Sequence, residues 1–429
     1  MKWRRPFRMT IRQLPLSTLI MCAAMGVAAQ DAGAADVHAR LQLQQQQDAT
    51  ASNSLAAQQG LSHSSPSSAE LRMMVQQHWG QWEGNLHYLA DWQHGSGVTL
   101  DRQLADAGVT DPTEALAQSD WWRLDPSGIN GNRTRSHLRA DRMWLGYTGQ
   151  HLVFRVGRQA LTWGSGQVFH PMDLFDPFAP TATDTEYKRG ADMLYGQWLF
   201  DDGSDVQGIV VPRRSPADGT LHPQSSSAAL HWHRAGYPMQ SNWLLARDYG
   251  DTVLGANLSG PAGDATWSLE AVSTLKDRGG VAVSLDAVIS NAFTLWHRNA
   301  NGFIEYYRNG FGLSGHDYAV SDIPQDLQLR LNRGQVFNTG IDYLAVGGTL
   351  EWTPLFQVAP NVIVNVRDHS ALAVLTMTDS LRENTDLVVG GQVPMGPQGT
   401  EFGGLETSAA SGVYLAPSRE VYLRLNQYF

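Results

Sequence analysis

The chain has 429 residues, of which 42% are hydrophobic and 17% charged, and its formal net charge is −10. This length fits one large domain or two ordinary ones, and the negative charge argues against nucleic-acid binding, which needs a basic surface. After the N-terminus no apolar stretch reaches about 20 residues, so a bundle of membrane-spanning helices is excluded.

Residues 1–35 have the pattern of a secretory signal peptide. An apolar stretch over 14–29, ending in small residues, follows the basic residues Lys2, Arg4, Arg5, Arg8 and Arg12. A single membrane anchor is the alternative, but the stretch is short and lacks a stop-transfer flank. The only cysteine, Cys22, lies inside this segment. The mature chain would therefore hold no disulfide and no thiolate metal site.

Residues 36–68 are predicted to be a polar, disordered periplasmic leader. They contain the glutamine run Gln44–Gln47 and many Ser and Ala residues, with scarcely an aromatic one. Such a segment cannot bury enough apolar surface to fold alone. A short helix that docks against the following domain is the alternative. The folded domain is then expected over 69–429.

From about residue 84, segments of roughly ten residues alternate between apolar and polar positions, separated by Gly, Asp, Asn and Pro. A period of two predicts strands, and this length lets a tilted strand cross a bilayer. A soluble sandwich or propeller would show shorter strands or a blade period. We therefore expect an all-β fold, a closed antiparallel transmembrane β-barrel of about 16 strands, within 14–18. The candidate strands are 83–92, 136–148, 151–161, 191–200, 204–213, 225–233, 240–248, 251–259, 264–275, 279–290, 301–309, 340–352, 361–368, 370–379, 383–393, 405–415 and 419–429.

The final nine residues, VYLRLNQYF, resemble the C-terminal signal that directs bacterial outer-membrane proteins into the barrel-assembly machinery. Phe429 carries most of the resemblance, and Gln427 departs from it where the pattern prefers an aromatic residue. The resemblance implies a cell outer-membrane location, with the assembly machinery, membrane lipid and lipopolysaccharide as partners. The barrel-insertion signal comprises Val421, Leu423, Leu425, Tyr428 and Phe429.

A second resemblance covers about forty residues, 154–194, which read FRVGRQALTWGSGQVFHPMDLFDPFAPTATDTEYKRGADML. This passage is similar to one in porin-like barrels related to the alginate-export and DUF1302-type families. The resemblance implies a passive channel for small solutes. Independently of it, nearly thirty residues separate two strands here, which is too long for a plain turn.

The long loop over 164–190 is expected to fold into the lumen and narrow the pore. Prolines stiffen it, and aromatic residues can anchor it to a wall. Between Asp173 and Asp192 five acidic groups face two basic ones, so its field is expected to favour cations. An extracellular or structural loop whose charges pair internally is the alternative. The pore-constriction candidates are Arg155, Arg158, Asp173, Asp176, Asp184, Glu186, Lys188, Arg189 and Asp192.

No sequence motif indicates catalysis. His231 and His233 share one face of a predicted strand, but no third metal ligand is evident. HExxH, GxSxG and Walker sequences do not occur. We therefore predict no catalytic residue, no metal, no cofactor and no nucleic-acid partner. The expected function is a porin-like outer-membrane channel. The alternatives are an assembly or scaffold barrel for surface-polysaccharide or lipid export and, less favoured, a membrane-embedded lipid hydrolase.

Overall fold

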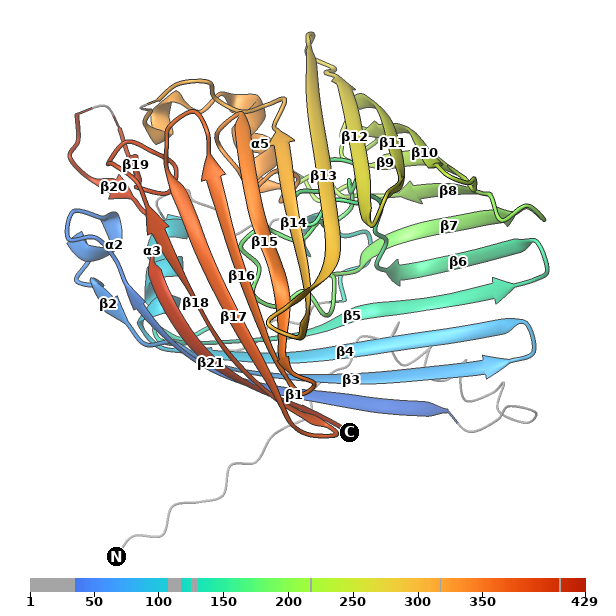
Figure 1. The fold of residues 1–429 in the computed structure, drawn as a ribbon, viewed down its shortest axis with the longest axis horizontal. Coiled ribbons are helices and arrows are strands. Elements are labelled where there is room, and N and C mark those ends of the chain that lie inside the picture. The colour runs from blue at the N-terminus through green and yellow to red at the C-terminus, as the bar shows by residue number, and fades with distance from the viewer. Residues whose placement is uncertain are drawn as a thin grey trace, which may run out of the picture.

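The computed structural model describes residues 35–106, 117–124, 128, 130–216, 218–316, 318–408 and 410–429. Its main feature is one antiparallel sheet that closes into a barrel of 18 strands (Figure 1). The barrel strands are β1 (Asp36–Ala49), β3 (Ser67–Trp79), β4 (Trp82–His94), β5 (Thr134–Thr148), β6 (Leu152–Gln159), β7 (Ala191–Leu199), β8 (Asp205–Val211), β9 (Ser227–Arg234), β10 (Gln240–Asp248), β11 (Asp251–Ala262), β12 (Ala265–Leu275), β13 (Val281–Leu295), β14 (Arg298–Arg308), β15 (Asp342–Thr353), β16 (Phe356–Asn365), β17 (Ala371–Arg382), β18 (Thr385–Met395) and β21 (Arg419–Tyr428).

The remaining elements are short and lie in the connections between barrel strands. None of the helices in the described ranges is long and apolar enough to cross a membrane. The elements are α2 (Leu55–Gln58), β2 (His63–Ser64), α3 (Ser96–Asp106), the 3-10 helix η1 (Val320–Asp322), α5 (Gln325–Asn332), β19 (Leu405–Glu406) and β20 (Tyr414–Leu415).

The barrel closes where its first strand meets its last. β1 pairs with β3 on one side and with β21 on the other, in a register that runs from Arg40 opposite Tyr428 to Ala49 opposite Arg419. Each of the other barrel strands pairs with the neighbours that precede and follow it in the chain. Closure leaves no barrel strand with an unpaired edge, which is the condition for a sheet to lie in lipid.

Side chains alternate between an apolar outer face and a mostly polar interior. On β21, Val421 and Leu423 are exposed on the outside, whereas Tyr422 and Arg424 are buried inside the barrel. Leu425 continues the outward row, as the sequence predicts. The same period of two places Leu, Val, Ile, Trp and Phe side chains on the outside of the other strands.

The two ends of the barrel differ in the length of their connections. At one end, turns such as 80–81 and 263–264 join neighbouring strands directly; we call this the short-turn end. The opposite, long-loop end holds connections such as 95–133 and 309–341. In Figure 1, α2, α5 and the β19–β20 hairpin lie away from the C-terminus, at the long-loop end. In outer-membrane barrels the short turns face the periplasm and the longer loops face outward.

The predicted leader over 36–68 is wrong, because β1 and the start of β3 lie within it. Val37, Leu41 and Leu43 do alternate with polar residues, but the glutamine run that follows conceals the pattern. The glutamines are compatible with a membrane-spanning strand for two reasons. Gln44 and Gln46 face the interior of the barrel, and Gln45 and Gln47 donate hydrogen bonds to Ser65, beyond the end of the apolar outer band. The barrel therefore begins at Asp36.

One further strand prediction is wrong. Residues 405–415 do not cross the barrel; they contain the small β19–β20 hairpin of the long-loop end. With β1 and β3 added and this segment removed, the strand number is 18 and not about 16. The predicted signal peptide, apart from Ala35, lies outside the described residues.

Candidate functional site

Residues 160–190, which connect β6 to β7, lie inside the barrel and are called the lumen loop here. Its first half is hydrogen-bonded to β12 and β14, and its second half to β1 and β21. These strands stand on different parts of the barrel wall, far from β6 and β7 in the strand order. A loop outside the barrel could not reach all of them, so the segment crosses the lumen.

Glu305 on β14 holds the first half of the lumen loop. Its fully buried carboxylate accepts hydrogen bonds from the backbone N–H groups of Gln167, Val168 and Phe169, at 3.2, 2.8 and 3.0 Å. The Phe169 ring also stacks on Tyr307, with ring centroids 4.4 Å apart. Three donors converging on one carboxylate form charge-assisted hydrogen bonds, which are about twice as strong as neutral ones.

Glu270 on β12 makes a second attachment of the same kind. Its carboxylate accepts hydrogen bonds from the Met172 N–H at 3.3 Å, from the Ser165 hydroxyl at 3.0 Å and from the Ser165 N–H. Asn257 on β11 donates to the Ser165 hydroxyl at 2.7 Å. The backbone N–H groups of the loop have no neighbouring strand to bond to here. Side chains of the barrel wall accept their hydrogen bonds instead.

Arg40 on β1 holds the second half of the loop. Its guanidinium lies 2.7 Å from the Glu186 carboxylate and 3.1 Å from that of Asp184, and it also contacts Glu70 on β3 at 2.7 Å. The ring of Tyr187 lies against the same guanidinium, 4.8 Å from its centre. On β21, Arg424 donates to Thr183 at 2.7 and 2.8 Å, and the Tyr428 hydroxyl donates to Glu186 at 2.9 Å.

Near the end of the loop, the buried Lys188 ammonium contacts both the middle and the beginning of the loop. The Lys188 ammonium lies 2.6 Å from the Asp173 carboxylate and donates to the carbonyl of Leu161. Burial raises the pKa of Asp173 to about 6, although the neighbouring ammonium opposes the shift. The charge of this pair therefore changes within an accessible range of pH.

A second cluster of charges surrounds Asp120, which precedes β5. Its carboxylate lies 2.6 Å from Arg189 and 3.0 Å from Arg158, and Arg189 also reaches Asp176 at 3.5 Å. Arg158 pairs with Asp192 at 2.8 Å. Burial raises the pKa of Asp120 to about 7, although the neighbouring guanidinium groups of Arg189 and Arg158 act to lower it.

Apolar side chains of the loop pack on the β7–β12 part of the wall. Met172, Phe175 and Trp163 are buried in a cluster with inward residues of these strands. Trp163 also stacks on His231, with ring centroids 4.9 Å apart, while His233 lies 3.2 Å from Asp205. The two histidines thus have different neighbours, and no group of three or more possible metal ligands occurs within the described residues.

Most of the charged residues that the sequence predicts to narrow the pore lie close together. They do not form an excess of unpaired negative charge, because basic side chains pair with the acidic ones. Asp173, Asp176, Asp184, Glu186 and Asp192 each lie within 4 Å of an Arg or Lys side chain. Arg155 stands apart on the wall, over the Trp144 ring at 4.6 Å. Sequence reasoning missed the anchoring residues on the wall. Their signal was a charged residue at an inward position of a strand: Arg40, Glu270, Glu305 and Arg424.

Two spaces with polar groups in their lining lie toward opposite ends of the barrel interior. One, of about 380 Å³, is bounded by Ser165 and Gln167 of the loop and by residues of β10–β13 toward the short-turn end, including Gln240 and Ser290. The other, of about 320 Å³, is lined by β1, β3, β4 and α3 at the long-loop end. The first space borders the loop directly, whereas the second has no loop residue in its lining.

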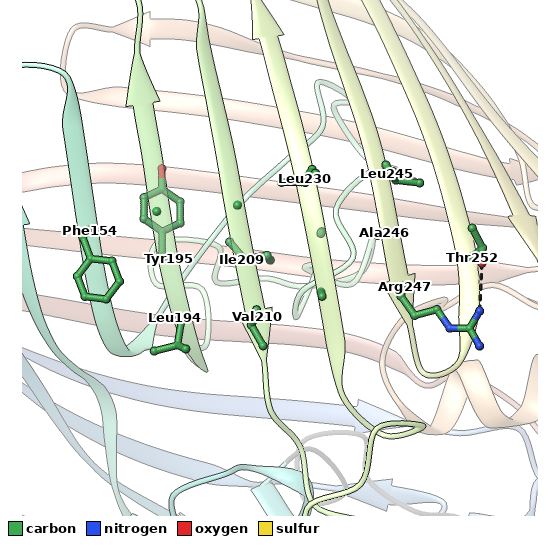
Figure 2. A pocket seen from close by; sticks show the side chains of 14 residues that line it. Phe154, Leu194, Tyr195, Ile209, Val210, Leu230, Leu245, Ala246, Arg247 and Thr252 are labelled. Atoms are coloured by element: carbon green, nitrogen blue, oxygen red, sulfur yellow. Dashed lines mark hydrogen bonds between the residues drawn. The ribbon is translucent and has the colours of Figure 1, made fainter.

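A larger apolar recess, of about 590 Å³, lies on the outside of the barrel (Figure 2). Leu194, Val210, Leu230 and Leu245 project outward around it, and Gly196 leaves open space between them. Its lining is continuous with the apolar outer face. The recess therefore belongs to the lipid-facing surface and not to the interior of the barrel.

A closed barrel with short turns at one end, an apolar exterior and a loop folded into its lumen defines a β-barrel of the outer-membrane type. No known protein-family model and no curated protein sequence matches the chain. Solved structures do match. OccK5 (OpdH) of Pseudomonas aeruginosa has 8% sequence identity and a TM-score of 0.52, covering 92% of this chain and 98% of that one.

Two further structures agree. A BenF-like porin from Pseudomonas fluorescens Pf-5 has 10% identity and a TM-score of 0.52, covering 92% of this chain and 98% of its own. OccAB3 of Acinetobacter baumannii has 10% identity and a TM-score of 0.51, covering 92% of this chain and 99% of that one. At these identities the likeness establishes a shared fold.

Proposed function

We propose that the protein is a porin-like channel of the cell outer membrane, through which small solutes diffuse passively. The fold it shares with a BenF-like porin supports this proposal, as does the apolar outer face. The transport step needs no chemistry: a solute enters at the long-loop end, passes the lumen loop and leaves at the short-turn end.

One observation carries the proposal: the lumen loop spans the interior between different parts of the wall, with a space containing polar groups toward each end of the barrel. Glu305 and Glu270 hold one half, and Arg40 and Arg424 hold the other. A segment fixed in this way sets the width of the passage. Its charges also lie where they act on a passing ion, because low-dielectric walls strengthen their field.

The resemblance of 154–194 to alginate-export and DUF1302-type barrels supports a narrower proposal, a distant relationship to those families. The resembling passage supplies the lumen loop, most of β6 and the beginning of β7. The proposed partners are a small solute, outer-membrane lipid and lipopolysaccharide, and the barrel-assembly machinery, which would recognise the strand that ends at Phe429.

Planar-bilayer recording of the purified protein tests the channel directly. We expect discrete conductance steps, and larger steps when residues 176–186 are replaced by a short Gly-Ser linker. Each preparation needs a folded barrel, shown by an electrophoretic mobility that changes only on boiling in SDS. A folded barrel that never conducts would contradict the proposal and favour the scaffold alternative.

A further inference from the structure

The polar pocket at the long-loop end has a lining suited to a specific class of solute. It has a volume of about 320 Å³, at the small end of the range for ligand pockets. Eleven of its 16 described lining residues carry amide, hydroxyl or carboxylate groups, whereas Leu61, Val98 and Leu100 are apolar, and no Arg or Lys is among the 16. These polar residues are Gln44, Gln46, Asp48, Thr50, Ser64, Ser67, Ser68, Gln93, Ser96, Asp101 and Ser418.

A hydrogen-bonded row on β1 forms one side of this pocket. The Arg424 guanidinium donates to the Gln44 carbonyl at 2.9 Å, and the Gln44 amide donates to the Gln46 carbonyl at 3.1 Å. The Gln46 amide donates to Asp48 at 2.7 Å, and the Ser64 hydroxyl donates to the other oxygen of that carboxylate at 2.6 Å. The row fixes the orientation of each amide.

Fixed amides of this kind pair well with hydroxyl groups. A primary amide has two N–H donors and a carbonyl with two lone pairs. The row uses one donor and one lone pair of Gln44 and of Gln46, so further donors and acceptors remain on each. A hydroxyl group both donates and accepts, and adjacent hydroxyls of a sugar or polyol present the same alternation. Residues two apart on a strand repeat along one face, which supplies such groups in a line.

The charges of the pocket disfavour an anionic ligand. Asp48 and Asp101 both line it. Arg135 of β5, which is not itself among the lining residues, lies 3.4 Å from the Asp101 carboxylate and donates to the Gln93 side-chain carbonyl at 2.9 Å. Arg424 is bound to Gln44 and to Thr183 of the lumen loop. A carboxylate or phosphate in this space would meet the Asp48 carboxylate, while Arg135 already holds Asp101 and Arg424 already holds Gln44. A neutral solute avoids that repulsion.

We propose that this pocket is a binding subsite for neutral polyhydroxylated solutes, of the size of a monosaccharide or of one unit of a disaccharide. The inference rests on the proposed channel function and names its substrate class. The site lies at the long-loop end, so a solute arriving from outside meets it before the lumen loop. Weak binding there raises the local concentration of solute at the entrance of the passage.

The test uses the folded protein in detergent, titrated calorimetrically with maltose, galacturonate and glucosamine. We expect maltose to bind, galacturonate not to bind, and glucosamine to bind no more tightly than maltose. Tighter binding of glucosamine would assign the pocket to cationic sugars and overturn the inference. Gln46→Leu and Gln93→Leu should each weaken maltose binding about three- to tenfold, the loss expected for one or two hydrogen bonds. Gln76→Leu is the matched control, because Gln76 also lies on the inner face of β3 but bonds to Glu83, away from the pocket.

The same preparations are then recorded in planar bilayers with maltose present. Transient current block by maltose in the wild type, reduced in Gln46→Leu and retained in Gln76→Leu, supports the subsite. Conductance without any maltose binding overturns the subsite and leaves the channel standing. Maltose binding without conductance overturns the channel and leaves the pocket standing. Binding of galacturonate in place of maltose, or equal losses in all three variants, also overturns the inference.

Discussion

Replacing Glu305 with Gln should loosen the lumen loop while leaving the barrel intact. The carboxylate accepts three backbone hydrogen bonds from the loop, at 3.2, 2.8 and 3.0 Å. A glutamine keeps one acceptor oxygen but turns an N–H toward these donors, so at least one bond is lost. A hydrogen bond to a charged group contributes about 1.5–3 kcal/mol, which corresponds to a roughly ten- to hundredfold weaker attachment.

Single-channel recording measures this loosening. We expect Glu305→Gln to show frequent excursions to higher conductance, because the loop leaves the wall for part of the time. Thermal unfolding of the barrel should hardly change, since the hydrogen bonds between strands remain. Glu83→Gln is the control: Glu83 is an inward glutamate of β4 that bonds to Gln76. If Glu305→Gln gives the same traces as the wild type and the control, the carboxylate does not hold the loop and the reasoning is refuted.

Three other predictions concern charge, pH and assembly. Asp184→Asn combined with Glu186→Gln removes the two negatively charged loop partners of Arg40, so the reversal potential should move toward anions, most clearly in dilute salt, where screening is weak. An unchanged potential would place these groups away from the ion path. Burial raises the pKa of Asp173 to about 6, so lowering the pH from about 8 to about 5 protonates this carboxylate and makes the net charge of the loop more positive. Ion selectivity should therefore shift toward anions. This change in selectivity should be smaller in Asp173→Asn, and an equal change would contradict the assignment. Deleting Phe429 removes the last backbone pairing with β1 and should lower the fraction of heat-modifiable barrel on SDS gels. The Phe429→Tyr variant should assemble normally. Normal assembly of the deletion variant would contradict the proposed C-terminal signal.

The period of two was enough to predict most of the barrel. It identified sixteen of the barrel strands, and the segment 240–248 matches β10 residue for residue. It missed β1 and β3, in each of which only part of the strand has an apolar outer face, and it wrongly included 405–415, where a similar pattern belongs to a hairpin at the long-loop end. Local sequence reports the alternation of side chains, but only pairing with neighbours decides whether a segment enters the sheet.

The lumen loop was predicted as a loop, but its electrostatics were not. The acidic residues Asp184 and Glu186 suggested a negative field because their partner, Arg40, lies on a strand about 146 positions away. The attachments to Glu270 and Glu305 are also distant in sequence. Nearly every residue type has a backbone N–H group, so hydrogen bonds donated by the backbone do not require particular residues in the loop. For this reason no sequence pattern in 164–190 could have indicated these attachments.

The pairing of β1 with β21 has a consequence for how the chain folds. Gln44 and Arg424 are 380 positions apart, and they meet only when every other strand is in place. Until then both strands are open edges, and each unpaired N–H or C=O in hydrocarbon costs several kcal/mol. A partly built sheet is therefore unstable within the bilayer. Closure of the seam and entry into the membrane must be concerted, so the rate of this one long-range pairing governs how quickly a finished barrel forms.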